Sequence, residues 1–140
     1  MKYLLDTVVV SEPARPAPDP RAIAWLAAQS PYDLAISALT VGEIQKGIAL
    51  LPSGRRRTGL EAWLANDLPR QFTGRLLAVD EAVARAWGRL SAAEQRRGRP
   101  VPVIDGLLLG TAQVHDLALV TRNEAHFAGR GVPLVNPYSH

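Results

Sequence analysis

The chain of 140 residues is 47% hydrophobic and 21% charged, which is the composition of a globular protein and not of a disordered one. It has no cysteine, which excludes a disulfide framework and a zinc–thiolate site and fits a cytoplasmic location. No signal peptide and no apolar run of membrane-spanning length is present, so no membrane contact is expected. The length favours one domain, residues 1–140.

The charge balance is mildly basic, with a net charge of +3 and a pI of about 9.8. Apart from Lys2 and Lys46, every positively charged side chain of the lysine and arginine type is an arginine. Arginine suits phosphate because its planar guanidinium binds two oxygens at once. The charge therefore permits a nucleic-acid partner, and it equally fits a solvated arginine-rich surface.

Short apolar runs alternate along the chain with stretches of helical periodicity. The apolar runs predict strands over 2–5, 34–36, 76–79, 118–121 and 133–135. Apolar periodicity and capping residues predict helices over 20–29 and 37–51, a third after the break at 52–54, a fourth that begins at Asp80, and a fifth from about Asp105 to 114. The proline-rich segment 13–20 is expected to be a loop. This alternation predicts an α/β fold of three layers, with a mostly parallel sheet between helices.

Three acidic residues lie in apolar surroundings. Asp6 directly follows the first strand, Glu43 lies early in the second helix, and Asp105 begins the helix after Val103-Ile104. Asn123 follows the strand that ends at Thr121. Because parallel strands end at one edge of the sheet, these side chains are expected to gather there.

Each acid alone also has a purely structural interpretation. Asp6 fits a cap on the turn after its strand, and Asp105 fits an N-cap or first-turn position. Glu43 fits a capping box with Thr40. If all three acids were purely structural, each would need its own separate explanation. A single shared site explains them together and is therefore favoured.

A shared site has a physical consequence. Two carboxylates 4 Å apart repel each other by roughly 4 kcal/mol at the effective dielectric of a protein surface. Protons or a divalent cation must compensate three such groups. Oxygen ligands suit Mg²⁺ or Mn²⁺, and the three histidines, His115, His126 and His140, are too scattered to predict a histidine metal site. The pattern therefore favours metal-assisted phosphodiester hydrolysis.

Five motifs follow one another along nearly the whole chain: Tyr3-Leu4-Leu5-Asp6-Thr7, Thr40-Val41-Gly42-Glu43-Ile44, Val103-Ile104-Asp105-Gly106-Leu107, Leu119-Val120-Thr121-Arg122-Asn123 and Gly131-Val132-Pro133-Leu134-Val135-Asn136-Pro137. This ordered set resembles the PIN-domain family, in particular the VapC- and FitB-type toxins of type II toxin–antitoxin systems.

This resemblance implies a PIN-like, Rossmann-like fold and a Mg²⁺- or Mn²⁺-dependent endoribonuclease. It implies that Asp6, Glu43 and Asp105 hold the metal, that Asn123 completes the acidic pocket, and that Thr7 and Thr121 support it. It also implies an RNA substrate, a homodimer, and a cognate antitoxin whose C-terminal segment lies in a groove. With the antitoxin, the chain is expected to form a heterotetramer or a larger complex that binds operator DNA through the antitoxin.

The first motif departs from the family pattern at one position. Val8 stands where the family usually has an asparagine that forms hydrogen bonds near the metal. The alternative function is therefore a catalytically weak PIN-fold module that binds an antitoxin or nucleic acid.

Other features leave two interpretations open. The arginine runs 55–57 and 96–99 fit contacts to RNA or to an acidic antitoxin, and they also fit solvated loops and helix starts. Trp63 fits the core or a partner groove. A haloacid-dehalogenase-like phosphatase needs a second aspartate where this chain has Val8, and a receiver domain needs an acidic pair and a late lysine that are missing.

Overall fold

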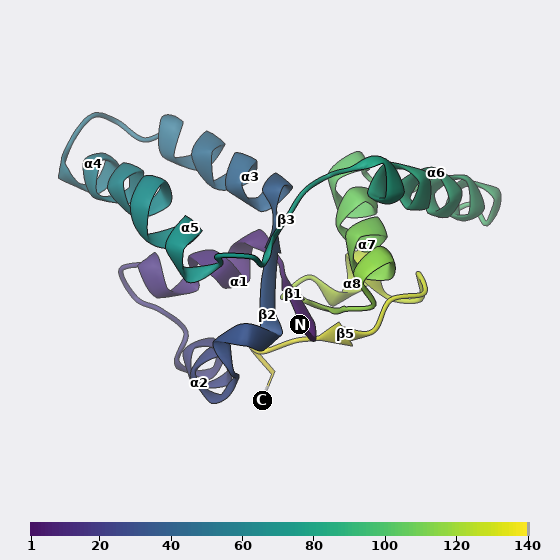
Figure 1. Ribbon diagram of the computed structural model, residues 1–140, viewed down its shortest axis with the longest axis horizontal. Helices are drawn as coiled ribbons and strands as arrows, with labels where there is room; N and C mark the ends of the chain where they lie inside the picture. Colours follow the sequence, from purple (N-terminus) through teal and green to yellow (C-terminus); the bar gives the residue numbers. More distant parts are fainter. Residues whose placement is uncertain (140) are drawn as a thin grey trace.

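A five-stranded sheet forms the middle layer of the computed structural model, which describes residues 1–139 (Figure 1). Its strands are β1 Tyr3–Leu5, β2 Leu34–Ser37, β3 Leu76–Leu77, β4 Ala118–Val120 and β5 Leu134–Val135. All neighbours pair in parallel, in the order β3-β2-β1-β4-β5. The predicted α/β fold with a parallel sheet is therefore confirmed. His140, one of the three histidines, lies outside the described residues.

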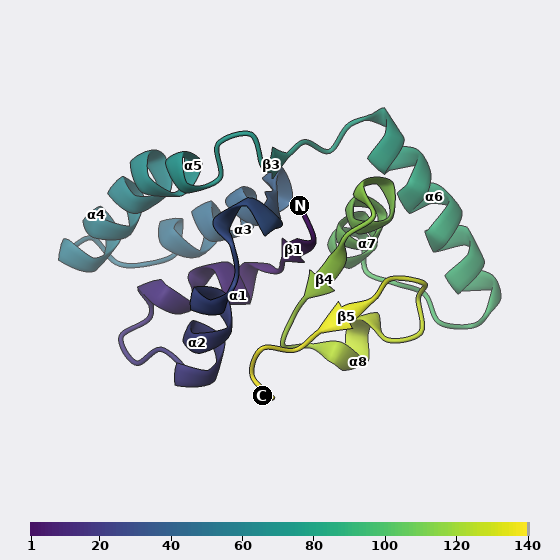
Figure 2. The same cartoon turned by 60° about the horizontal axis from the view of Figure 1, so that its bottom comes forward.

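Helices cover both faces of this sheet, and Figure 2 shows the two groups on opposite sides of the strands. The helices are α1 Thr7–Ser11, α2 Pro20–Ala28, α3 Ala38–Ala49, α4 Arg55–Ala62, α5 Leu68–Gln71, α6 Glu81–Arg96, α7 Val103–His115 and α8 Glu124–Phe127, with 3-10 turns at Glu12–Ala14 and Pro31–Asp33 and a π turn at Trp63–Asp67. Within residues 1–139, no helix is long and apolar enough to cross a membrane.

Several helices begin where the sequence predicts a cap. The carboxylate of Asp19 accepts from the Arg21 amide at 2.9 Å, and that of Asp80 accepts from the Val83 amide at 3.0 Å. Ser37 caps α3 through the Leu39 amide at 3.0 Å. Because these bonds satisfy amides that lack a partner within the helix, they fix the starts of α2, α6 and α3.

The segment after β1 differs from the prediction. Residues Thr7–Ser11 form α1, and the 3-10 turn Glu12–Ala14 includes the first two residues of the expected loop. Three consecutive valines have low helix propensity, so the local pattern does not predict α1. Asp6 caps α1, and the burial of Val9 and Val10 overrides that propensity. Strand β3 is also shorter than predicted, because only Leu76 and Leu77 pair with β2.

Alternating residues of the strands supply two cores. One core contains Leu5, Ile36 and Val120 and lies under α1–α5. The other contains Leu4, Ala35 and Leu119 and lies under α6–α8. Successive residues of a strand point to opposite faces, which explains why such short strands are apolar throughout.

The strand order places a topological switch point at β1. The chain moves from β1 to β2 and β3 on one side, and β4 then pairs with β1 on the other side. In open α/β sheets, a crevice opens at the carboxyl ends of the strands on either side of such a point. Asp6 follows β1 and Thr121 follows β4, so both lie at this crevice.

Candidate active site

Asp6 is the centre of the polar contacts at the switch point. Its amide donates to the Val120 carbonyl at 2.9 Å, which continues the pairing of β1 with β4. Its Oδ1 accepts from the Thr7 amide at 2.8 Å, and its Oδ2 accepts from the Thr121 hydroxyl at 2.9 Å. The carboxylate is therefore held by groups that follow β1 and β4, and Asp6 is only 8% exposed.

Burial raises the pKa of Asp6 above its ordinary value of 3.8. The hydrogen bonds from Thr121 and Thr7 oppose this rise, and the negative charge of Asp105 adds to it. His126 lowers the pKa slightly. Without a cation nearby, the fold thus disfavours the charged form of this carboxyl group.

Asp105 lies in the first turn of α7, and Pro102 takes the N-cap position. The Asp105 side chain is 23% exposed, and its Oδ2 lies 3.6 Å from Nδ1 of His126 on α8. Asp105 therefore interacts electrostatically with the two site groups Asp6 and His126. No sequence pattern indicates that His126 lies at the site, because the position of His126 depends on how α8 packs against α7.

Glu43 joins the site through Thr7. The Thr7 hydroxyl donates to Oε1 of Glu43 at 2.6 Å, which connects α1 with α3. The capping box with Thr40 is not formed, because Ser37 caps α3. Glu43 is therefore directed toward the residue that follows Asp6, and no helix cap accounts for its position.

Thr121 links Asp6 to Asn123. Its hydroxyl donates to Asp6 and accepts from the Asn123 amide at 3.0 Å. Asn123 is exposed and precedes α8. The backbone of Asn123 is thus tied to the acidic edge, the end of the sheet where Asp6, Asp105 and Glu43 lie. The side chain of Asn123 is accessible from solvent.

The carboxylates do not form a compact trio. Within residues 1–139, no three side chains of histidine, cysteine, aspartate or glutamate gather closely enough to hold an ion between them. Asp6 and Asp105 influence each other, whereas Glu43 is connected through Thr7. That all three carboxylates bind one ion therefore stays a prediction.

A groove of about 300 Å³ runs beside Glu43, between α1 and the hairpin of α3 with α4. Its apolar lining includes Ile44, Ile48, Leu60 and Trp63, and its polar lining includes Thr7, Arg15, Glu43 and Arg56. Trp63 is only partly buried, so it belongs both to the edge of the core and to the groove.

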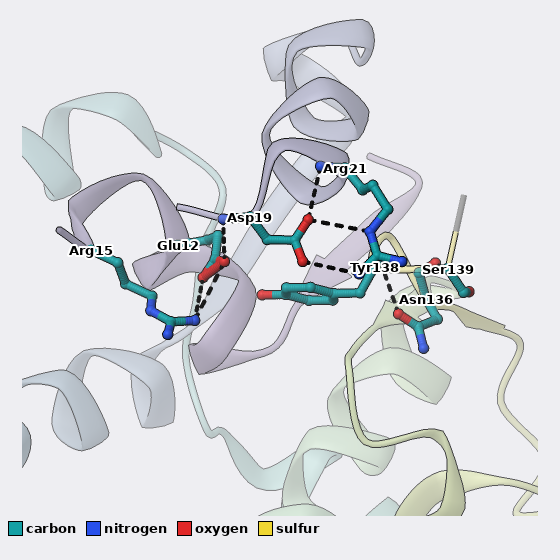
Figure 3. A network of polar contacts seen from close by, with 7 residues as sticks. All are labelled: Glu12, Arg15, Asp19, Arg21, Asn136, Tyr138 and Ser139. Atoms are coloured by element: carbon teal, nitrogen blue, oxygen red, sulfur yellow. Dashed lines mark hydrogen bonds and ion pairs between the residues drawn. The ribbon is translucent and has the colours of Figure 1, made fainter. Parts of the chain in front are cut away.

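A buried acid that the sequence analysis missed supports this groove. Glu12 is fully buried and accepts from Arg15 at 3.0 Å and from the Asp19 amide at 2.9 Å (Figure 3). These bonds close the proline-rich loop and hold Arg15 at the groove. Burial and the charge of Glu12 raise the pKa of nearby Tyr138 to about 12. A lone glutamate in a non-periodic segment carries no signal of such a role.

The arginine runs divide between structural and accessible positions. Arg57 donates to Glu61 at 2.7 Å and to the Leu51 carbonyl at 3.1 Å, whereas Arg56 lines the groove. Arg97 and Arg99 donate to the carbonyls of Gly129 and Ala128. Three of these six arginines, Arg57, Arg97 and Arg99, therefore stabilise the fold, a role beyond the solvated loops and helix starts expected from the sequence.

The model of the PIN domain family matches residues 3–130. The Toxin FitB of Neisseria gonorrhoeae is 36% identical over 96% of this chain and 97% of its own length. The VapC ribonuclease Y4jK of Sinorhizobium fredii is 33% identical over 96% of each chain.

A solved structure is similar to this chain in both sequence and fold. The structure of FitAB bound to an IR36 DNA fragment contains a chain that is 34% identical to this one, with a TM-score of 0.92. The match covers 97% of this chain and 95% of that one. The similarity therefore includes the strands and helices that form the acidic edge.

Proposed function

Because this chain belongs to the PIN-domain family, we propose that it is the ribonuclease toxin of a type II toxin–antitoxin pair and acts in the cytoplasm. The observation that carries the proposal is the acidic edge at the switch point. There Asp6 is held by Thr121 and coupled to Asp105. The ribonuclease name of the VapC relative supports hydrolysis of RNA as the reaction.

The donor atoms at this edge fit Mg²⁺ or Mn²⁺. Mg²⁺ is usually bound through one or two carboxylates together with waters and substrate phosphates, so it does not need a third carboxylate at ligand distance. Asp6 and Asp105 would hold the ion, and Glu43 would take part directly or through a water. When bound, a divalent ion supplies the charge that activates water and polarises a phosphodiester.

The remaining site residues orient these carboxylates. Thr121 fixes Oδ2 of Asp6 and the Thr7 amide fixes Oδ1, which leaves the unused lone pairs of both oxygens for a ligand. Thr7 fixes Glu43 in the same way from the other side of Asp6. The exposed amide of Asn123 lies where it can hydrogen-bond an incoming RNA. Precise orientation of charged groups is what a hydrolytic site requires.

The groove beside Glu43 fits the antitoxin. The FitAB structure supports a complex of toxin and antitoxin on DNA, and we extend this arrangement to the present chain, with the antitoxin binding operator DNA. An amphipathic helix would place apolar side chains on Ile44, Ile48 and Trp63. A basic residue at its end would pair with Glu43 and compete with the metal.

A second apolar surface on the same edge fits another copy of the chain. It consists of Leu39, Val79 and Ile104, with Glu43 and Lys46 beside them, around a hollow of about 350 Å³. Val79 and Ile104 are each 39% exposed. A homodimer through this surface would bury these side chains next to the acidic edge.

Cleavage of RNA by the purified chain tests the proposed function. The free chain should degrade RNA with Mg²⁺ or Mn²⁺, lose this activity in EDTA, and recover it when the metal is restored. Its expression should arrest growth unless a small DNA-binding protein encoded beside it is co-expressed. Cleavage that is insensitive to EDTA, or no cleavage with either ion, would contradict the proposal.

The alternative is a PIN-fold binding module with weak catalysis, favoured by Val8. Val8 is 36% exposed, directly follows Thr7 and lies two positions after Asp6. If Val8 limits turnover, Val8→Asn should raise the cleavage rate several-fold without changing antitoxin affinity. Tight antitoxin binding with no cleavage in either protein would favour the binding module.

A further inference from the structure

A buried ion pair lies behind the acidic edge, on the side of α6. The side chain of Glu94 is 4% exposed and that of Arg130 is 8% exposed. Nη1 of Arg130 lies 3.1 Å from Oε1 of Glu94, and Arg97 donates to the other carboxylate oxygen at 2.9 Å. Glu94 is therefore fully paired although it is buried.

Arg130 uses its other contacts to hold backbone. Nη1 also donates to the Arg99 carbonyl at 2.8 Å, and Nε donates to the His126 carbonyl at 2.9 Å. The guanidinium thus joins α6, the loop after it and the end of α8. Gly129 and Gly131 have φ values of 71° and 86°, which lets the chain turn around this contact.

The tie to His126 reaches the site. Helix α8 has only four residues, so it is too short to be stable without tertiary contacts. It begins after Asn123, which is tied to Thr121, and carries His126, which lies 3.6 Å from Asp105. One end of α8 is thus fixed at the acidic edge, and the other end is fixed by Arg130.

We propose that Glu94 and Arg130 are positioning residues that set the place of α8, and with it Asn123 and His126, against Asp105. This inference rests on the proposed function only in what it says about cleavage. The placement of α8 can be measured without RNA or metal.

A double substitution separates placement from stability. Removing Arg130 alone leaves Glu94 buried beside a single partner, which is strongly destabilising. Replacing both residues by methionine removes the buried charges together, and such a replacement is often neutral for stability. The tie to His126 is lost in both variants. Arg89→Met is the matched control, because Arg89 is exposed and lines the surface hollow that Glu94 and Arg130 also line.

Hydrogen exchange and kinetics on the full chain test the proposal. In E94M/R130M, the amides of residues 122–131 should exchange at least about tenfold faster, while the thermal midpoint stays close to that of the wild type. At saturating Mn²⁺, kcat for RNA should fall about 10- to 100-fold with little change in KM, as for other supporting residues around a metal site. Arg89→Met should change none of these values.

Two outcomes would overturn the inference: unchanged exchange over 122–131 in the folded double variant, or raised exchange with unchanged kcat. If the double variant does not fold, Arg130→Lys replaces it, since lysine keeps the charge opposite Glu94 but lacks the planar fork that reaches His126. The same exchange criterion then applies. If the wild-type chain cleaves no RNA, the proposed function fails, and exchange over 122–131 alone decides the placement of α8.

Discussion

The two faces of the sheet are closed in different ways. Where α7 packs against α6 the contact is tight, because Gly106 and Gly110 of α7 bring that helix against Trp87 of α6. A hollow of about 510 Å³ lies away from this contact, beside Glu94 and Arg130. A Cβ atom at Gly106 would lie 2.9 Å from Cδ1 of Trp87. Under α1–α5 the packing is incomplete, because a groove of about 300 Å³ separates α1 from the α3–α4 hairpin.

This difference assigns the faces different tasks. The tightly packed face carries Asp105 and His126, whose places the proposed hydrolysis requires to be fixed. The open face carries Glu43 and Trp63 and leaves room for a partner. Asp6 lies between the faces at the end of β1, so it is shared by both.

The largest expected effect is on cleavage, through the tightly packed face. Asp105→Asn removes one of two coupled carboxylates and should lower RNA cleavage by about 10³-fold, which corresponds to roughly 4 kcal/mol of activation free energy. Asp116→Asn is the control, because it lies at the other end of α7 and asparagine tolerates its left-handed backbone. Equal activity in the two variants would contradict a role for Asp105.

The next effect is on stability. Gly106→Ala should lower the free energy of unfolding by about 1–3 kcal/mol, because Trp87 must move to admit the methyl group. Gly88→Ala on α6 meets no atom within 4 Å and should be neutral or stabilising. Urea denaturation measures both, and a neutral Gly106→Ala would show that the packing of this face is loose.

A smaller effect is expected on the open face. A Cβ at Gly47 meets no atom within 4 Å, although Gly47 lines the groove. Gly47→Leu should therefore keep the fold and weaken antitoxin binding about tenfold by filling the groove. Gly59→Leu is the control, since it adds the same side chain to α4 outside this lining. Titration calorimetry would contradict the groove assignment if both variants bind alike.

The smallest effect concerns pH and Asp6, between the faces. The raised pKa means that the metal-free folded chain keeps this proton at pH values where the unfolded chain, with a pKa near 3.8, has lost it. Stability should therefore fall as pH rises from 3.8 through the raised pKa. Asp6→Asn should remove this fall and stabilise the metal-free chain at pH 7 by on the order of 1 kcal/mol.

Asp19 provides the opposite case. The hydrogen bond with Arg21 lowers the pKa of Asp19. Asp19 therefore contributes to the stability of the folded chain at neutral pH, and this contribution is lost as pH falls through the lowered pKa. Asp19→Asn keeps a capping side chain and should flatten only the acidic end of the stability curve. Thermal midpoints of the wild type, Asp6→Asn and Asp19→Asn, measured from pH 3 to 8 in EDTA, distinguish the effect of Asp6 from that of Asp19. If the thermal midpoint of Asp6→Asn falls with rising pH as that of the wild type does, Asp6 is not the group that causes this fall.

The sequence predicts the layers of this fold because its signals are local. Caps such as Asp19 and Asp80 mark helix starts, and apolar runs mark buried strands. Helix α1 is not predictable in this way, since its valines form a helix only through burial. The π turn after α4 has no local signal either.

The site is predictable only in part for the same reason. The shared edge of Asp6 and Asn123 follows from parallel strands, and the PIN resemblance points to Thr7 and Thr121. Buried Glu12 and Glu94 each pair with an arginine three residues on, and they also bind the Asp19 amide and Arg130 from other segments. The burial of these acids and the contacts with other segments depend on tertiary packing, which no local pattern of the sequence encodes.

Binding of Mn²⁺ to the purified chain tests the central claim most directly, namely that Asp6 and Asp105 together hold a divalent cation. Titration should show binding to the wild type and to Asp116→Asn, and at least about tenfold weaker binding to Asp6→Asn and to Asp105→Asn. Equal affinity in all four proteins, or no binding to the wild type, would contradict the claim.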